Sequence, residues 1–122
     1  MLIVESVGAD DFADFVVLLH KRQLELSERI REHDEEARAL RAARTEDVAD
    51  DEHDPEGSTL SLEWARLEAI REAEAGESEA IKHALERIRS GTYGVCEGCG
   101  RMIPAGRLTV RPFAAHCVSC AS

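Results

Sequence analysis

Apolar side chains recur in the first half of the chain at alternating steps of four and three residues. The positions in this series are Phe12, Val16, Leu19, Gln23, Leu26, Ile30, His33, Ala37 and Leu40. Such an alternation is a heptad seam, the pattern of helices that pack side by side in coiled coils. It predicts a helix over about residues 11–46, with Asp10 or Asp11 as its N-cap.

A second seam follows the break at residues 54–57. Its positions are Leu60, Trp64, Leu67, Arg71, Glu74, Ser78, Ile81, Leu85 and Ile88. The pattern predicts a helix over about residues 58–90, capped by Asp54 or Ser58 and ended by Gly91.

The middle of the second seam is polar, and Gly76 lies within it. A glycine in a helix interior costs about 1 kcal/mol relative to alanine. We therefore expect a loosened stretch here, in which Ile70, Ala73 and Ala80 could take over the packing face.

Two helices of nearly equal length with a short connection favour an antiparallel hairpin. The predicted fold is therefore mainly α: a long coiled-coil hairpin within residues 1–90, followed by a small lobe over residues 91–122. Residues 47–57, here called the acidic tip, form the connection and carry six acidic residues. Acids in a loop can simply be solvated, but a cluster at the end of a hairpin could also reach a cation or a basic surface.

All four cysteines lie in the C-terminal lobe. Cys96 and Cys99 form one C-x-x-C pair, Cys117 and Cys120 form another, and 17 residues separate the inner two. Two such pairs supply the four thiolates of a structural zinc site. Redox C-x-x-C motifs accompany a βαβ pattern, which is absent, and disulfides need an oxidising compartment. We therefore predict one structural Zn²⁺, with Gly98 and Gly100 serving the positive φ angles of the first pair.

The segment between the cysteine pairs contains Met102-Ile103-Pro104 and residues 107–112, which we expect to be extended around a turn at Ala105-Gly106. Arg101, Arg107 and Arg111 make this lobe basic. They could offset the thiolates and pair with the acidic helices, or they could contact phosphate.

Charge and hydropathy exclude several classes of function. The formal net charge is −10, and 24 of the 25 acidic residues precede Gly91, so the whole protein is a poor binder of phosphate backbones. No apolar run approaches the roughly 20 residues of a membrane-spanning helix. The N-terminus lacks the basic and apolar regions of a secretory signal, so we expect a cytoplasmic protein.

A distinctive segment precedes each of the two cysteine pairs. Ile88-Arg89-Ser90-Gly91-Thr92-Tyr93-Gly94 leads into the first pair, and Arg107-Leu108 through Arg111-Pro112 precedes the second. With the acidic hairpin, these residues resemble the DksA/TraR family of four-cysteine zinc-finger transcription regulators over about residues 10–122.

Members of that family bind RNA polymerase rather than promoter DNA and insert a coiled-coil hairpin into its secondary channel. The resemblance implies the same partner and route here, with tip aspartates near the catalytic centre. Asp47 with Asp50, and Asp51 with Asp54, satisfy the D-x-x-D part of the family pattern, whereas a glutamate replaces the small residue that follows. Arg111 matches the family's nucleotide-contacting arginine and is a candidate nucleotide or phosphate contact, but we do not predict guanosine tetraphosphate as a ligand.

Other functions stay open at this point. The chain could be a coiled-coil zinc protein that acts as an adaptor for another protein, without a transcription role. A direct nucleic-acid contact through Arg101, Arg107 and Arg111 has little support, because aromatic stacking partners are few, and no sequence-specific DNA binding is expected. No catalytic constellation is recognisable, so no enzyme is predicted. Polar seam positions could specify a hairpin or a dimer, and we expect a monomer.

Overall fold

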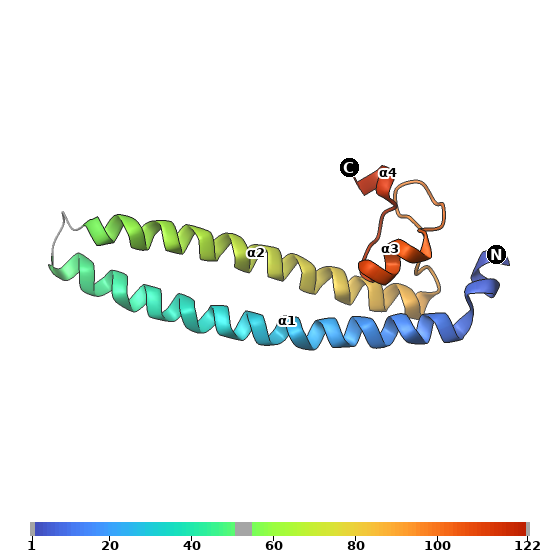
Figure 1. Ribbon diagram of the computed structural model, residues 1–122, viewed down its shortest axis with the longest axis horizontal. Coiled ribbons are helices and arrows are strands. Elements are labelled where there is room, and N and C mark those ends of the chain that lie inside the picture. The colour runs from blue at the N-terminus through green and yellow to red at the C-terminus, as the bar shows by residue number, and fades with distance from the viewer. Residues whose placement is uncertain (1, 51–54, 122) are drawn as a thin grey trace. The chain divides into compact units, whose positions relative to one another are not determined.

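The computed structural model describes residues 2–50 and 55–121, and within them the side chains of residues 12–45 and 59–121. Four helices follow one another along the chain: α1 (Leu2–Asp50), α2 (Pro55–Ser90), α3 (Ala105–Val110) and α4 (Val118–Ala121). The long helices α1 and α2 run antiparallel, side by side (Figure 1). The mainly helical hairpin predicted from the two seams is thus confirmed.

The chain forms two compact units. One, here called the zinc-lobe unit, comprises Met1–Leu24 and Glu77–Ser122; the other, the hairpin unit, comprises Glu25–Gly76. Each unit contains part of α1 and part of α2. The predicted domain boundary between residues 90 and 91 divides the chain differently from these two units, and it stays a prediction.

The hairpin unit has a narrow apolar core. Ala37, Leu40 and Leu67 are buried together, with Leu60 and Trp64 packed against them. Leu67 has no exposed surface, and full burial of a leucine side chain contributes about 1.5–3 kcal/mol. The seams predicted these contacts.

Hydrogen bonds and ion pairs between side chains fill the polar middle of this seam. The Glu74 carboxylate is buried, and its oxygens lie 2.8 and 3.0 Å from His33 Nδ1. Arg71 pairs with Asp34 across the two helices at 2.8 Å and with Glu68 on its own helix at 3.0 Å. The hydrogen bond to Asp34 raises the pKa of Arg71. These pairs satisfy the polar groups within the seam, and α2 continues through Gly76 without interruption. The helix is therefore not interrupted here, whereas the expected loosening stays a prediction.

Both long helices extend beyond their predicted starts. Helix α1 begins at Leu2 rather than near residue 11, and residues 2–11 contain no proline that would interrupt it. Helix α2 begins at Pro55, and proline favours the first turn of a helix because its missing N–H would have no intrahelical partner there. Gly91 follows Ser90 with φ +85° and ends α2 as predicted.

The core of the zinc-lobe unit gathers around Tyr93. Its ring lies edge-on to Phe12 and tilted against Phe15, with both centroid separations 5.6 Å. The Tyr93 hydroxyl donates to the Pro112 carbonyl oxygen at 2.7 Å. Burial raises the pKa of Tyr93, opposed by the positive charge of Arg87. The Tyr93 side chain therefore contacts α1 through Phe12 and Phe15, and it contacts the segment before the second cysteine pair through Pro112.

Helix α3 corrects one prediction. Residues 105–110 are helical rather than extended. The Pro104 carbonyl accepts from the N–H groups of Arg107 and Leu108, and the Thr109 hydroxyl donates to the Ala105 carbonyl oxygen. These bonds offset the β preference of Thr109 and Val110, while Leu108 is buried. No helix in the described part of the chain is long and apolar enough to span a membrane.

Candidate metal centre

The first cysteine pair sits on a tight backbone turn. Val95 and Met102 form an antiparallel bridge, and the Cys96 N–H donates to the Arg101 carbonyl oxygen at 2.7 Å. Gly100 closes the turn by donating to the Cys96 carbonyl oxygen, with φ +80°. A side chain would be strained at that φ, which explains the glycine.

Gly98 is required for a different reason. Its φ is not positive, but a Cβ built there would lie 3.0 Å from Cys120 Sγ. The second cysteine pair therefore approaches the first so closely that a side chain at position 98 would displace a thiol. The prediction of a positive φ is confirmed for Gly100 and wrong for Gly98.

The structure brings all four predicted ligands together. The Sγ atoms of Cys96, Cys99, Cys117 and Cys120 all lie within 4.8 Å of one another. The Cys99 and Cys117 sulfurs are 3.9 Å apart, close to the separation of about 3.8 Å expected on a tetrahedron with zinc–sulfur bonds of about 2.3 Å. Four cysteines are thus positioned to bind one metal ion.

Backbone donors favour the thiolate form of Cys96. The N–H groups of Cys117 and Gly98 each lie 3.3 Å from Cys96 Sγ. The Cys117 hydrogen bond is the main cause that lowers the pKa of Cys96 to about 5, against the effect of burial. Its hydrogen bond with Cys96 raises the pKa of Cys120 to about 12. Backbone hydrogen bonds thus favour the ionised form of Cys96, and a bound cation would favour ionisation of all four thiols.

This donor set fits zinc. Four thiolates close the coordination sphere, so a zinc ion held here supplies a cross-link between the two cysteine pairs and leaves no position for a substrate. The role of the metal is structural, as the sequence predicted.

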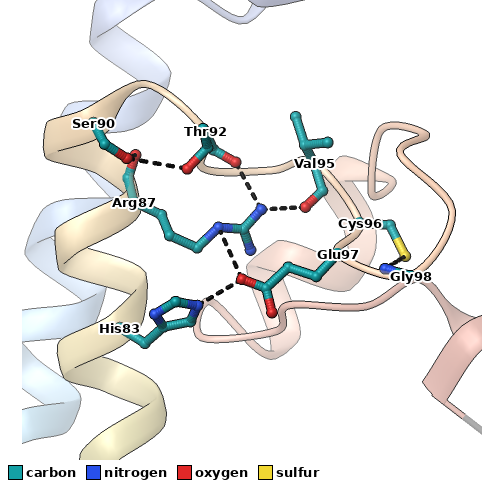
Figure 2. Close-up of polar contacts among 8 residues, drawn as sticks. All are labelled: His83, Arg87, Ser90, Thr92, Val95, Cys96, Glu97 and Gly98. Atoms are coloured by element: carbon teal, nitrogen blue, oxygen red, sulfur yellow. Dashed lines mark hydrogen bonds and ion pairs between the residues drawn. The ribbon is translucent and has the colours of Figure 1, made fainter.

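Three polar side chains join α2 to the first cysteine pair (Figure 2). Arg87 lies on the last turn of α2 and donates to the carbonyl oxygens of Thr92 and Val95. Glu97, between the two cysteines, lies 3.5 Å from Arg87 Nε and accepts a 2.6 Å hydrogen bond from His83 Nε2. This His83 hydrogen bond, aided by the charge of Arg87, lowers the pKa of Glu97.

Sequence reasoning missed this group. His83 and Arg87 both lie outside the seam positions of the second helix, so the heptad pattern does not single out either residue. A buried arginine has no sequence signal of its own, because arginine is ordinarily exposed.

Two of the basic residues predicted in the lobe, Arg107 and Arg111, make local contacts. Arg107 Nε donates to the His116 carbonyl oxygen at 2.8 Å. The guanidinium groups of Arg111 and Arg22 lie 5.2 and 5.4 Å from the centroid of the Phe113 ring. Arg22 also pairs with Glu77 at 2.8 Å. The phosphate contact predicted for Arg111 stays a prediction.

The predicted tip residues are described only in part. Helix α1 includes the backbone of Asp47 and Asp50, but their side chains lie outside the described residues. Asp51 and Asp54 lie outside them entirely. Their assignment as acting aspartates is taken up below as a proposal.

Two cysteine pairs around one metal position, following a long antiparallel helical hairpin, define a four-cysteine zinc-finger protein. Comparison with known proteins supports this class. The family model described as "Prokaryotic dksA/traR C4-type zinc finger" matches residues 91–122. The solved structure of transcription factor DksA2 from Pseudomonas aeruginosa aligns over 94% of this chain and 83% of that one, with a TM-score of 0.75 and 25% identity. The resemblance to the DksA/TraR family is thus supported by the family model over the zinc-finger lobe and by the DksA2 structure over most of the chain.

Two curated proteins are also similar. An uncharacterized protein of Aquifex aeolicus is 42% identical over 55 residues, and general stress protein 16O of Bacillus subtilis is 34% identical over 64 residues. The alignments cover 45% and 52% of this chain, but only 38% and 39% of the relatives' own lengths.

Proposed function

We propose that this protein regulates transcription by binding RNA polymerase, with its coiled-coil hairpin entering the secondary channel. The observation that carries the proposal is the structural similarity to transcription factor DksA2, which extends over 94% of the chain. It covers the helical hairpin as well as the zinc lobe. A match confined to the zinc lobe would fit many zinc-finger proteins.

The charge distribution supports this route. Residues 1–90 carry 24 of the 25 acidic residues, and the acidic tip carries six of them. An acidic hairpin gains favourable electrostatic energy in a basic, metal-containing channel, which also increases the association rate. Asp47, Asp50, Asp51 and Asp54 are the proposed acting residues of the tip.

The remaining assignments follow from this role. The zinc ion maintains the lobe that carries the two ends of the hairpin helices, and the protein acts as a cytoplasmic monomer. Sequence-specific DNA contact is not needed, because the partner is the polymerase. Arg111 is the proposed contact if a nucleotide or phosphate group takes part.

A transcription assay with purified RNA polymerase tests the tip. The variant combines Asp50→Lys, Asp51→Lys and Asp54→Lys, and the matched control reverses three exposed hairpin acids: Glu28→Lys, Glu35→Lys and Glu63→Lys. Both variants make the same change in net charge. We expect the tip variant to lose its effect on transcription while remaining folded, and the control to keep most of it.

If the tip variant regulates transcription as the parent does, the proposed tip mechanism is wrong. If the parent neither binds RNA polymerase nor changes transcription, the adaptor function becomes the better interpretation. Capture of core RNA polymerase by the zinc-loaded protein separates these two results.

A further inference from the structure

The guanidinium of Arg87 is almost fully enclosed, although the residue lies near the end of a helix. The whole residue is 6% exposed, whereas the side chain of Arg89, two positions later, is 83% exposed. Burying a cation is costly unless it is paired and hydrogen-bonded. The contacts of Arg87 must therefore offset the cost of burying its guanidinium.

Several of those contacts are with the segment that leads to the zinc ligands. The Arg87 carbonyl oxygen accepts from the N–H groups of Thr92 and Tyr93 at 2.9 and 3.2 Å. Its guanidinium donates to the carbonyl oxygens of Thr92 and Val95. Arg87 thus holds the connection before Cys96 through its backbone carbonyl and also through its guanidinium, whose contacts Figure 2 shows.

Glu97 connects Arg87 to the metal site. It stands inside the first cysteine pair, and its carboxylate contacts both Arg87 and His83 of α2. Its N–H donates to the Ala115 carbonyl oxygen at 2.8 Å, two residues before Cys117. Glu97 therefore touches α2 through its side chain and the approach to the second cysteine pair through its backbone.

We propose that Arg87 is a positioning residue of the zinc site, which acts through Glu97 and the two loop carbonyls. Arg87 holds the first cysteine pair near its ligating geometry before the metal arrives, so less ordering is required on binding. The coupling is reciprocal, as linkage demands. Zinc binding fixes the loop that Arg87 contacts and thereby stabilises the last turns of α2.

Zinc affinity of the full chain measures the proposed role. Competition with a chromogenic chelator at fixed pH is carried out on the parent, on Arg87→Gln and on the exposed control Arg89→Gln. We expect Arg87→Gln to weaken zinc binding by about 10- to 100-fold, the usual effect of removing a group that supports metal ligands. Arg89→Gln should bind as the parent does. Arg87→Lys, which keeps the charge without the planar fork, should recover part of the affinity.

A second readout distinguishes positioning from general stability. Amide hydrogen exchange of residues 83–92 is compared in the zinc-loaded and chelator-treated protein. In the parent, zinc removal should accelerate exchange in these residues. In Arg87→Gln this zinc-dependent difference should shrink, because the loop is no longer tied to the helix.

Two results would overturn the proposal. One is a folded Arg87→Gln protein whose zinc affinity equals that of the parent. If Arg87→Gln does not fold, Glu97→Gln replaces it as the test. It leaves both carbonyl contacts of Arg87 intact and removes the charge that joins Arg87 and His83 to the cysteine pair. Unchanged zinc affinity in folded Glu97→Gln would likewise refute the role, whereas a loss would support it.

Discussion

The contact between His33 and the buried Glu74 predicts that a more hydrophobic residue at position 33 lowers the free energy of unfolding. Hydrophobicity alone would predict the opposite. Both residues occupy seam positions, so leucine at either site adds apolar surface to the interface between the two helices. The Glu74 side chain is 9% exposed and that of His33 is 22% exposed. Removing the partner of a buried, hydrogen-bonded carboxylate leaves that charge without compensation, whereas replacing both partners with apolar residues is often neutral or stabilising.

His33→Leu should therefore lower the free energy of unfolding. It leaves the Glu74 carboxylate with one remaining charged partner among the described residues, Arg29, whose Nε lies 3.9 Å away. The full cost of breaking a buried pair is about 3–5 kcal/mol, and the remaining arginine should reduce it to about 2–3 kcal/mol. Glu74→Leu should cost less, within about 1 kcal/mol, because the more exposed His33 can turn toward water. The double variant should return to the parent's stability or exceed it.

Urea unfolding of the zinc-loaded protein measures these differences, with far-UV circular dichroism and Trp64 fluorescence as probes. For a slope of about 1–3 kcal/mol per molar urea, His33→Leu should lower the midpoint by about 1 M or more. His20→Leu is the matched control, because His20 is an exposed histidine of the same helix, and it should change stability by less than about 0.5 kcal/mol. Additive single effects in the double variant would refute the reasoning, since they would mean that the two side chains do not depend on each other.

Three further predictions concern other contacts. Leu67→Ala should cost about 2–5 kcal/mol by opening a cavity in the hairpin core, whereas Leu62→Ala, at a position 72% exposed, should cost less than about 0.5 kcal/mol; urea midpoints compare them. Tyr93, the single tyrosine, should ionise in the folded protein only above its ordinary pKa of about 10. Because burial raises the pKa of Tyr93, the free energy of unfolding should not change through this group below about pH 10, and it should fall as the pH rises further. A tyrosinate absorbance that appears at the ordinary pKa, while the helices remain folded, would contradict the burial of Tyr93. Zinc removal by a chelator should alter the Tyr93 signal before that of Trp64, because the metal supports the unit that contains Tyr93; simultaneous changes in both signals would argue against this order.

The seams show how far sequence patterns could predict the fold. Every described member of both seams is buried or partly buried, including the polar Gln23 and Ser78. A helix face is a local property with a fixed period, so sequence alone reveals it. The same holds for the cysteine pairs, whose spacing is dictated by the geometry of a tetrahedral ion.

The missed features depend on contacts between distant residues. Helix α3 was predicted as extended from Thr109 and Val110, but burial of Leu108 and the Pro104 carbonyl outweigh that local preference. The contact between Glu97 and His83 joins positions 14 residues apart on different elements. Neither position carries a pattern that would reveal the other, so only the structure could identify the pair.

Equilibrium binding of the zinc-loaded protein to core RNA polymerase, with and without a competitor that occupies the secondary channel, tests the central claim most directly. The account predicts saturable binding that the competitor abolishes and that weakens as salt screens the acidic hairpin. Absence of binding, or binding that the channel competitor leaves unchanged, would contradict it.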